Sequence, residues 1–472
     1  MGDVRFSSPI FAAALAGMLG LLVGASPASA EDDEPAPVPP PDTGVPGPYV
    51  GYAARPALVR ETRACSLRTP VCVHASSRVP GRTVLDVLGA AERAWETLSG
   101  ALGLGTPDVD PDDLAYHVYL IEGASEPGVT RVSARDVRSR IDRARVFTVL
   151  DANLRAGCHL DALVAREIAR AVLARVAPAT ADGIARAQTT YLAQLMVPCA
   201  VGLAADSAQI FQSRPERAVC DARAFEVGTS PDEARSASAA SDAFMEGAAL
   251  FWARIDAAFG RAPASIVMAS WALAPTMTDV GSKRWHDEPD AFDVLRVSFK
   301  NALSTGSTLD DLLLDSAVAR AFMGSSDDGL HQLATRTLGD GARVPLDWDL
   351  PWPTTPKRVA PRAAVYPSGA SYLMIHRGTA APGARLRVEI AWEEHALFRW
   401  ALVKLDAQGR ELGRVAIPTR ERATETQMTL VDLDRVDRVL RVGVNAGDPS
   451  YRFDPDDEIW EPHAWLVTLA SE

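Results

Sequence analysis

Apolar residues recur three and four positions apart through most of the chain before residue 340, which is the spacing of amphipathic helices. The first such segment is 84–102. The same spacing predicts further helices at 160–176, 183–197, 241–259, 263–273, 290–303 and 309–323. Two runs rich in β-branched and aromatic residues, 116–121 and 146–150, predict strands. Residues 50–340 are therefore predicted to form a mainly helical region with a small sheet.

The pattern changes after residue 340. Residues 341–368 are crowded with prolines and are predicted to be a linker. Further on, apolar and charged residues alternate, most clearly at 386–390 (Leu-Arg-Val-Glu-Ile), as expected for a strand with one buried face. Short runs of this kind predict an antiparallel β-sandwich over 369–472. The expected fold class is therefore α+β, with more than one domain.

The first thirty residues have the pattern of a targeting segment. Arg5 precedes an apolar run at 10–24, and small residues at 28–30 provide a cleavage site, so 1–30 is predicted to be a signal peptide. Residues 31–48 are acidic and rich in proline, which predicts an extended tether. No later run is apolar for long enough to cross a membrane, so no span is expected in the mature chain. We expect an exported protein, whether periplasmic, at the cell surface or extracellular.

The 472-residue chain is 47% hydrophobic and has a formal net charge of −13. A chain of this length can bury large apolar cores, which agrees with more than one domain. Proteins that bind a phosphate backbone rely on a basic surface. The acidic balance therefore argues against a nucleic acid partner.

If the protein is exported, disulfides are expected among the five cysteines, because disulfides persist in oxidising compartments. Cys65 and Cys72 enclose a short loop that a disulfide would close easily. One further disulfide is expected among Cys158, Cys199 and Cys220. The pairs Cys158–Cys199 and Cys199–Cys220 both stay open. No Cys-x-x-Cys pattern favours zinc binding by these residues.

Residues 164–173 (Val-Ala-Arg-Glu-Ile-Ala-Arg-Ala-Val-Leu) are the stretch that is most informative about chemistry. With His in place of Arg166 and Arg170, this decapeptide would be an H-E-x-x-H helix, in which two His bind zinc and the Glu is a general base. Arginine stays protonated in proteins and offers no lone pair to a metal. Glu167 therefore has the position of the base without a metal-bound water to act on.

This layout resembles the gluzincin metallopeptidases, in which a strand beside the substrate cleft precedes the H-E-x-x-H helix and a later helix supplies a third ligand, a Glu. The resemblance covers about 120–325 and places Arg186, near Tyr191, at the position of that third ligand. It implies a degenerate fold of this kind that lacks zinc ligands, catalytic residues and a cofactor. If Arg166, Arg170 and Arg186 converge, they would form a positive cleft that repels a metal and suits carboxylates.

Other interpretations stay open. The apolar stripe of the decapeptide is also typical of an ordinary amphipathic helix, whose Arg and Glu side chains would form its solvated face. Glu246 begins an E-G-A-A string that could mimic a third ligand, although no His pair accompanies it. A carboxylate-rich run is a weak calcium candidate without EF-hand spacing, and an exposed acidic turn is favoured there. Its members are Asp454, Asp456, Asp457 and Glu458.

We expect an exported, non-catalytic protein that binds a peptide, a carboxylate-bearing ligand or a protein partner. Its candidate ligand-binding residues are Arg166, Glu167, Arg170 and Arg186. Neither a metal nor a cofactor is expected among them. The alternatives are a structural component of the cell envelope that docks through its β-sandwich, and a hydrolase whose site the sequence does not reveal.

Overall fold

The computed structural model describes residues 50–136, 141–225, 230–274, 284–285, 289–301, 308–331, 338–378, 380–419, 423–447 and 460–472. The predicted signal peptide (1–30) and the predicted tether (31–48) lie outside the described residues. The calcium candidate at Asp454, Asp456, Asp457 and Glu458 lies outside them as well. The described residues, from 50 onward, belong to one compact unit.

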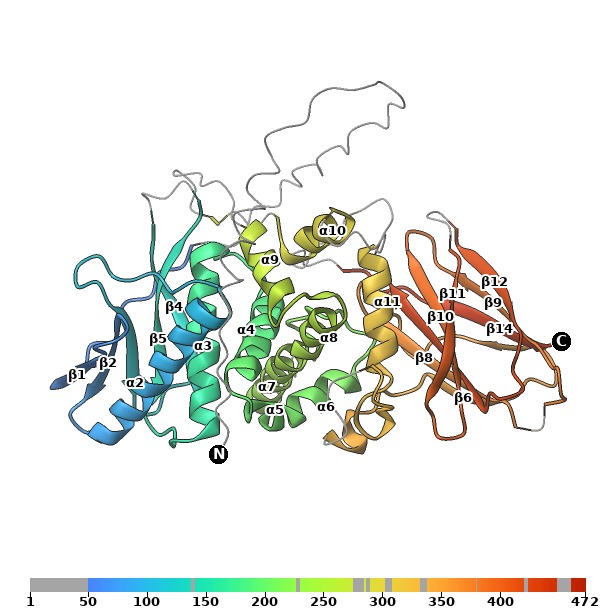
Figure 1. Cartoon of the computed structure of the whole chain (residues 1–472), viewed down its shortest axis with the longest axis horizontal. Coiled ribbons are helices and arrows are strands. Elements are labelled where there is room, and N and C mark those ends of the chain that lie inside the picture. Colours follow the sequence, from blue (N-terminus) through green and yellow to red (C-terminus); the bar gives the residue numbers. More distant parts are fainter. Residues whose placement is uncertain are drawn as a thin grey trace, which may run out of the picture. The chain divides into compact units, whose positions relative to one another are not determined.

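The first sheet has five strands in the order β1-β2-β3-β5-β4. Their bounds are Glu61–Cys65 (β1), Val71–Ser76 (β2), Tyr116–Ile121 (β3), Gly128–Arg135 (β4) and Ala144–Asp151 (β5). β2, β3 and β5 run parallel, whereas β1 and β4 are antiparallel edge strands. Helices α2 (Gly81–Glu96) and α3 (Cys158–Val176) pack side by side against this sheet (Figure 1). The predicted strands at 116–121 and 146–150 are confirmed as β3 and β5.

Helices occupy most of the chain between this sheet and residue 320. Their bounds are Asp182–Met196 (α4), Ala200–Leu203 (α5), Ala205–Ser213 (α6), Pro231–Gly247 (α7), Ala249–Phe259 (α8), Ser265–Leu273 (α9), Ala291–Asn301 (α10) and Leu309–Arg320 (α11). Five of the predicted helices match α3, α4, α9, α10 and α11 to within a few residues. The single helix predicted at 241–259 was wrong, because α7 begins at Pro231 and the chain divides into α7 and α8 at Ala248.

Gly247 explains how closely α6 and α7 approach each other. A Cβ atom at this position would lie 2.2 Å from the carbonyl oxygen of Ser207 and 2.5 Å from Cβ of Phe211, both on α6. Such distances are far shorter than a van der Waals contact, so only glycine fits here. The neighbouring residue on α7, Glu246, accepts a 3.3 Å hydrogen bond from Ser207 Oγ on α6.

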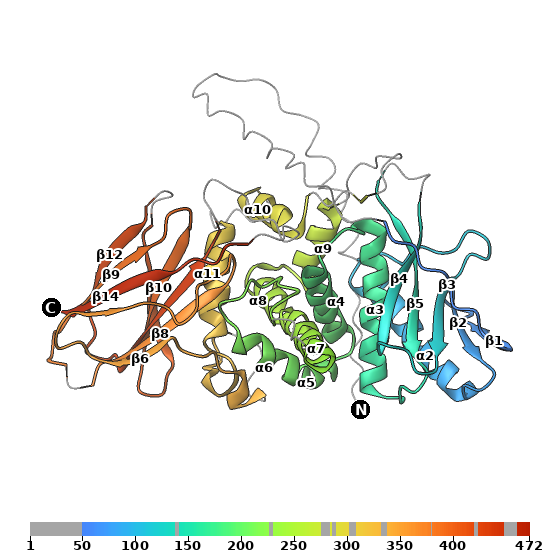
Figure 2. The same cartoon turned by 180° about the vertical axis from the view of Figure 1, so that it is seen from behind.

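Two further sheets occupy the chain from residue 348 onward (Figure 2). One has five strands in the order β11-β10-β13-β8-β6, and the other has four in the order β12-β9-β14-β7. The bounds are Trp348–Pro351 (β6), Lys357–Val359 (β7), Ala370–His376 (β8), Leu386–Trp392 (β9), Phe398–Leu405 (β10), Glu411–Ile417 (β11), Glu425–Leu430 (β12), Arg438–Asn445 (β13) and Trp465–Ser471 (β14). Buried side chains from both sheets, among them Ile375, Ile390 and Trp400, share one apolar cluster.

The proline-rich range 341–368 does more than link two regions. It supplies β6 and β7, which lie at the edges of the two C-terminal sheets. β6 pairs in parallel with β8, and Pro351 ends it. An edge strand tolerates proline because one side of its backbone has no ladder hydrogen bonds to lose. The prolines therefore concealed two strands.

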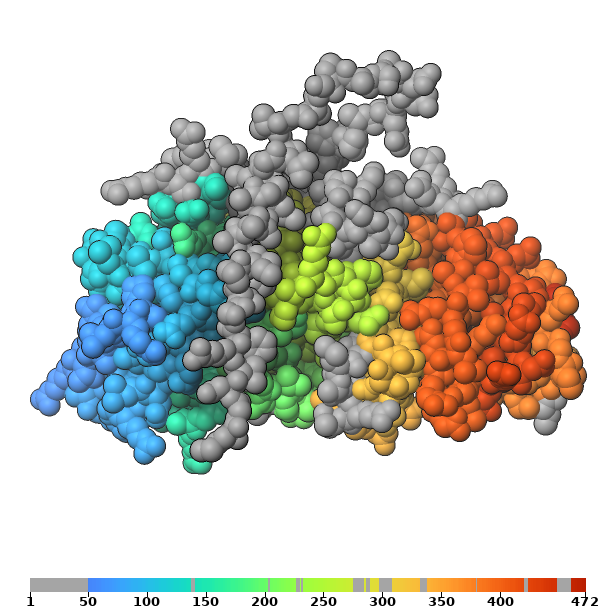
Figure 3. Space-filling model, in the orientation of Figure 1, coloured from blue at the N-terminus to red at the C-terminus, as the bar shows by residue number. Residues whose placement is uncertain are grey.

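The C-terminal five-stranded sheet also packs on the helices. α11 lies against β10 and β13, and the residues around α11 adjoin the C-terminal strands in the space-filling view (Figure 3). Tyr372 on β8 donates a 2.8 Å hydrogen bond to the carbonyl of Ala317 on α11. Because both faces are covered, β13 is buried along nearly its whole length, whereas β9 keeps the alternation of a half-buried strand.

Two disulfides join pairs of cysteines that the sequence had singled out. Cys65–Cys72 is confirmed, with its sulfur atoms 2.10 Å apart. The second is Cys158–Cys199, which joins the first residue of α3 to the residue before α5. Cys220 is buried and belongs to neither disulfide. Within the described stretches, no helix combines the length and apolar character needed to cross a membrane.

Candidate functional site

A polar cleft lies where the edge strand β4 faces helices α3 and α4. It has an empty volume of about 860 Å³, part of which is continuous with the surrounding solvent. Arg166, Glu167 and Arg170 reach it from α3, and Arg186 reaches it from α4. The four candidate residues therefore line one cleft, although the sequence separates the first from the last by twenty positions.

Glu167 is buried at the base of this cleft. Only 5% of the residue is exposed, and its carboxylate accepts a 2.9 Å hydrogen bond from Thr130 Oγ1 on β4. The Nε of Arg166 donates a second hydrogen bond of 3.0 Å to the same carboxylate. Both oxygens of the carboxylate are thus engaged by protein groups.

Arg166 joins two acidic residues from separate helices. Besides Glu167, its guanidinium forms a close ion pair with Glu246 on α7. Burial opposes the charge on Arg166, but the two carboxylates outweigh this effect and raise its pKa above the ordinary value. Arg166 therefore supplies positive charge between two carboxylates, at a position where the resemblance would put a zinc ligand.

Arg170 and Arg186 are paired with acidic groups nearer to the solvent. Arg170 contacts Asp182 at 2.6 Å, and the Asp182 side chain is 73% exposed. Arg186 lies 3.3 Å from Asp242, whose side chain is 45% exposed. Ion pairs with one exposed member are weak because water screens them. A carboxylate from a ligand can therefore compete with Asp182 and Asp242 for these two arginines.

The cleft is not the positive pocket that the sequence suggested. Three arginines do converge there, but each is paired with at least one carboxylate. The carboxylates belong to Glu167, Asp182, Asp242 and Glu246. Burial raises the pKa of Asp242, Arg186 opposes that rise and Glu246 adds to it. The expected repulsion of a metal by net positive charge is therefore not supported. The chemistry of the arginine side chains still makes them unsuitable as ligands.

The decapeptide does not present an ordinary solvated face. The Arg166 side chain is 17% exposed and that of Glu167 is 7% exposed. The sequence singled out Glu246 as a possible mimic of the third ligand but did not predict its pairing with Arg166. It gave no indication of Thr130, Asp182 or Asp242. The E-G-A-A string was the signal for Glu246. The others come from strand β4, the start of α4 and the interior of α7, which only the fold brings beside α3.

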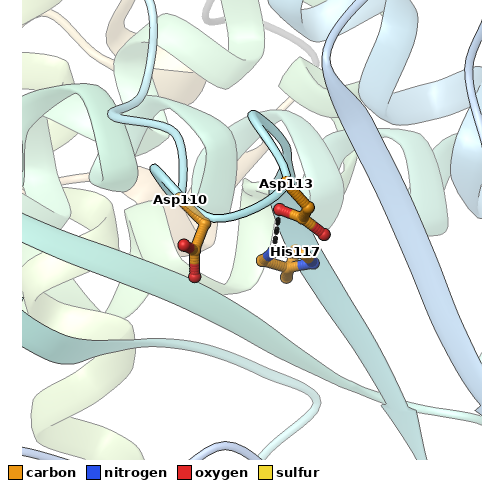
Figure 4. Close-up of side chains that lie close together, drawn as sticks. All are labelled: Asp110, Asp113 and His117. Atoms are coloured by element: carbon orange, nitrogen blue, oxygen red, sulfur yellow. Dashed lines mark ion pairs between the residues drawn. The ribbon is translucent and has the colours of Figure 1, made fainter.

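One group of metal-ligating side chains lies elsewhere among the described residues, and none of its members lines the cleft. It consists of Asp110, Asp113 and His117, which lie together at the start of β3 (Figure 4). Asp113 and His117 are four residues apart, a spacing that a search for His pairs alone does not detect.

Comparison with known proteins gives no family for this chain. No known family model matches it, and no curated protein matches it. Among solved structures, the enzymatically active domain of tailspike protein 4 of bacteriophage CBA120 aligns with a TM-score of 0.17 and 13% identity over 25% of this chain. The VP2 subviral particle of infectious bursal disease virus aligns with a TM-score of 0.16 and 9% identity over 25% of this chain. The alignments span 18% and 33% of those chains. Likenesses this weak carry no argument about fold or function.

Proposed function

We propose that this is an exported, non-catalytic protein that binds an extended, acidic peptide segment in the cleft between β4, α3 and α4. In this proposal the region around the cleft is a degenerate gluzincin-like fold, and the two C-terminal sheets form a β-sandwich attached to it. The observation that carries the proposal is the convergence of Arg166, Glu167, Arg170 and Arg186 on one cleft beside an edge strand.

The edge strand supplies the main-chain part of recognition. β4 pairs with β5 on one side only, so its other edge can accept a further strand. Ala53 already donates a 2.8 Å hydrogen bond to the carbonyl of Val132 on this outer edge. Main-chain groups alternate along a strand, so those of Thr130 face outward too, and Thr130 lines the cleft. A peptide laid along Gly128–Thr130 would pass directly over α3.

The arginines supply the selectivity for acidic side chains. Guanidinium groups recognise carboxylates through paired, charge-assisted hydrogen bonds. Arg170 and Arg186 are the two whose present partners are substantially exposed, so exchange of those partners for a ligand carboxylate costs little. Arg166 stays between Glu167 and Glu246 and holds the base of the cleft in shape.

The same contacts support the non-catalytic part of the proposal. The two positions that would carry zinc-binding His are arginines, which offer no lone pair to a metal, and the Glu167 carboxylate is hydrogen-bonded to Thr130 and Arg166. The two disulfides agree with an oxidising, exported location.

A direct binding experiment tests where the peptide sits. The probe is a fluorescein-labelled hexapeptide of alternating valine and glutamate, and the measurement is fluorescence anisotropy. We expect Arg170→Gln to weaken binding at least about tenfold, because a charge-assisted pair is lost. Arg82→Gln on α2 is the matched control, since Arg82 is 89% exposed and remote from the cleft. Equal affinity of the wild type and Arg170→Gln would remove the cleft from consideration.

A further inference from the structure

Asp110 and Asp113 lie in the tight loop that leads into β3, and His117 is the second residue of that strand (Figure 4). One oxygen from each carboxylate and one ring nitrogen of His117 lie within 4.8 Å of one another. The loop is held by its own backbone, because the amide of Leu114 donates to the carbonyl of Asp110 at 2.8 Å. Three potential ligands thus come from eight consecutive residues.

The ring of His117 points a buried nitrogen into this group. His117 is 4% exposed, and its Nε2 is buried without a hydrogen-bond partner. Nε2 lies 3.2 Å from Oδ1 of Asp113, close enough for an ion pair but not aligned for a hydrogen bond. A buried polar atom that lacks a partner costs free energy, so a group that fills this gap would be stabilising.

The other side of the ring shows how His117 is held in place. Nδ1 of His117 lies 2.9 Å from Nε2 of His74, and Nδ1 of His74 is hydrogen-bonded to Glu61. One ring nitrogen of His117 therefore has a partner on the neighbouring strand. The other, Nε2, faces the Asp113 carboxylate without a hydrogen bond.

A buried ring nitrogen without a hydrogen-bond partner, beside two carboxylates, is an arrangement that a metal cation can complete. Ligands about 2.0–2.1 Å from a tetrahedral zinc ion are roughly 3.3 Å apart, which is close to the 3.2 Å between His117 and Asp113. Arg63 holds the other oxygen of Asp113 at 2.6 Å, and Arg55 pairs with Asp110. Ligating residues commonly have such outer partners, which fix their orientation. His74 and Glu61 do the same for His117.

We propose that Asp110, Asp113 and His117 form a binding site for a divalent transition metal such as Zn²⁺, with His74 and Glu61 as the outer relay. This site is separate from the cleft beside α3 and does not depend on the proposed peptide binding. An imidazole nitrogen and two carboxylate oxygens favour zinc or a similar ion over calcium, which binds oxygen alone. Asp113 is exposed, so solvent reaches the ion and a fourth position stays open to water.

Calorimetric titration of the full chain with Zn²⁺ alone, after treatment with a chelator, tests the site. We expect one zinc ion per chain in the wild type and at least a hundredfold weaker binding in Asp113→Asn, which removes an exposed ligand without disturbing the core. Asp112→Asn is the matched control. It removes the same charge from the neighbouring residue, whose side chain is exposed and does not belong to the group of three ligands. It should bind zinc as the wild type does.

A second measurement separates binding from damage to the fold. Zinc should raise the midpoint of thermal unfolding of the wild type and of Asp112→Asn, but not that of Asp113→Asn, because a ligand that binds only the folded state stabilises it. His117→Gln should lose zinc binding as well. If the wild type binds no zinc, a proton fills the gap beside His117 Nε2 and the proposal is wrong. Equal zinc binding by Asp112→Asn and Asp113→Asn would also overturn it.

Discussion

Arg166 on α3 forms an ion pair with Glu246 on α7, a residue 80 positions later in the chain. The contact leaves Glu167 and Glu246 paired with one guanidinium. One fixed side-chain cation thus lies between two carboxylates.

Restoring histidines tests whether α3 is a degenerate zinc helix. We predict that Arg166→His with Arg170→His, in an Asp113→Asn chain, binds one zinc ion, because the two His would share a helical face and Glu246 lies beside the first of them. Zinc content after dialysis is the measurement, and the Asp113→Asn chain alone is the control. If the two chains retain the same zinc, α3 is an ordinary helix and the resemblance fails.

Gly247 provides a test of how α7 is positioned. Gly247→Ala should lower the free energy of unfolding by about 1–3 kcal/mol, because the added Cβ would meet the Ser207 carbonyl at 2.2 Å and force α6 and α7 apart. Gly202→Ala on α5 is the control, since a Cβ there meets nothing within 4 Å. Its stability should be unchanged or slightly higher. Denaturant unfolding of both variants is the measurement, and equal stability would contradict the close approach.

His331 should make stability depend on pH near neutrality. It lies 2.9 Å from Asp328 and 2.6 Å from Glu411, which is on β11. Burial acts to lower the pKa of His331, but these two hydrogen bonds outweigh it and raise the pKa above 6.5. The stabilisation is therefore complete below pH 6.5 and is lost as the pH rises through the raised value. The pKa values of both carboxyl groups are lowered, so their contribution is lost only in acid.

Replacement of this histidine provides the measurement. His331→Gln should lower the free energy of unfolding at pH 6 by about 1–3 kcal/mol, because the buried Asp328 carboxylate loses its cation and Glu411 keeps only Arg414. Above neutral pH the difference from the wild type should shrink. His376→Gln is the control, since His376 and its partner Asp349 are 45% and 60% exposed, and it should cost less than about 1 kcal/mol. A difference that does not change with pH would show that His331 is uncharged.

The sequence predicted best the elements in which apolar residues follow a regular helical spacing, form a β-rich run or alternate with charged residues. Helices α3 and α4 and strands β3 and β5 lie close to their predicted bounds, and the half-buried strand β9 matches the alternation at 386–390. β6 and β7 were missed because prolines mask edge strands. The mixed α+β class was correct. The division of 241–259 at Ala248 was missed because the apolar spacing continues through it; Gly247, just before the division, lies in close contact with α6.

The candidate site was predicted only in part, for a comparable reason. The four residues Arg166, Glu167, Arg170 and Arg186 do line one cleft, and the sequence identified them from spacing on two helices. Their charge partners were not predicted, because tertiary packing brings Asp182, Asp242 and Glu246 beside these arginines. The net charge around the cleft depends on residues from several helices, so it cannot be predicted from the residues of α3 alone. His74 and His117 lie on neighbouring strands 43 residues apart, which no sequence spacing reveals.

The most direct test of the central claim compares two peptides on the wild-type protein. One is the hexapeptide of alternating valine and glutamate, and the other has glutamine in place of each glutamate. We predict that anisotropy gives at least about tenfold tighter binding of the glutamate peptide, and that mass spectrometry finds both peptides intact after prolonged incubation. Equal affinity for the two peptides, or fragments cut from either, would contradict a non-catalytic cleft that recognises carboxylates.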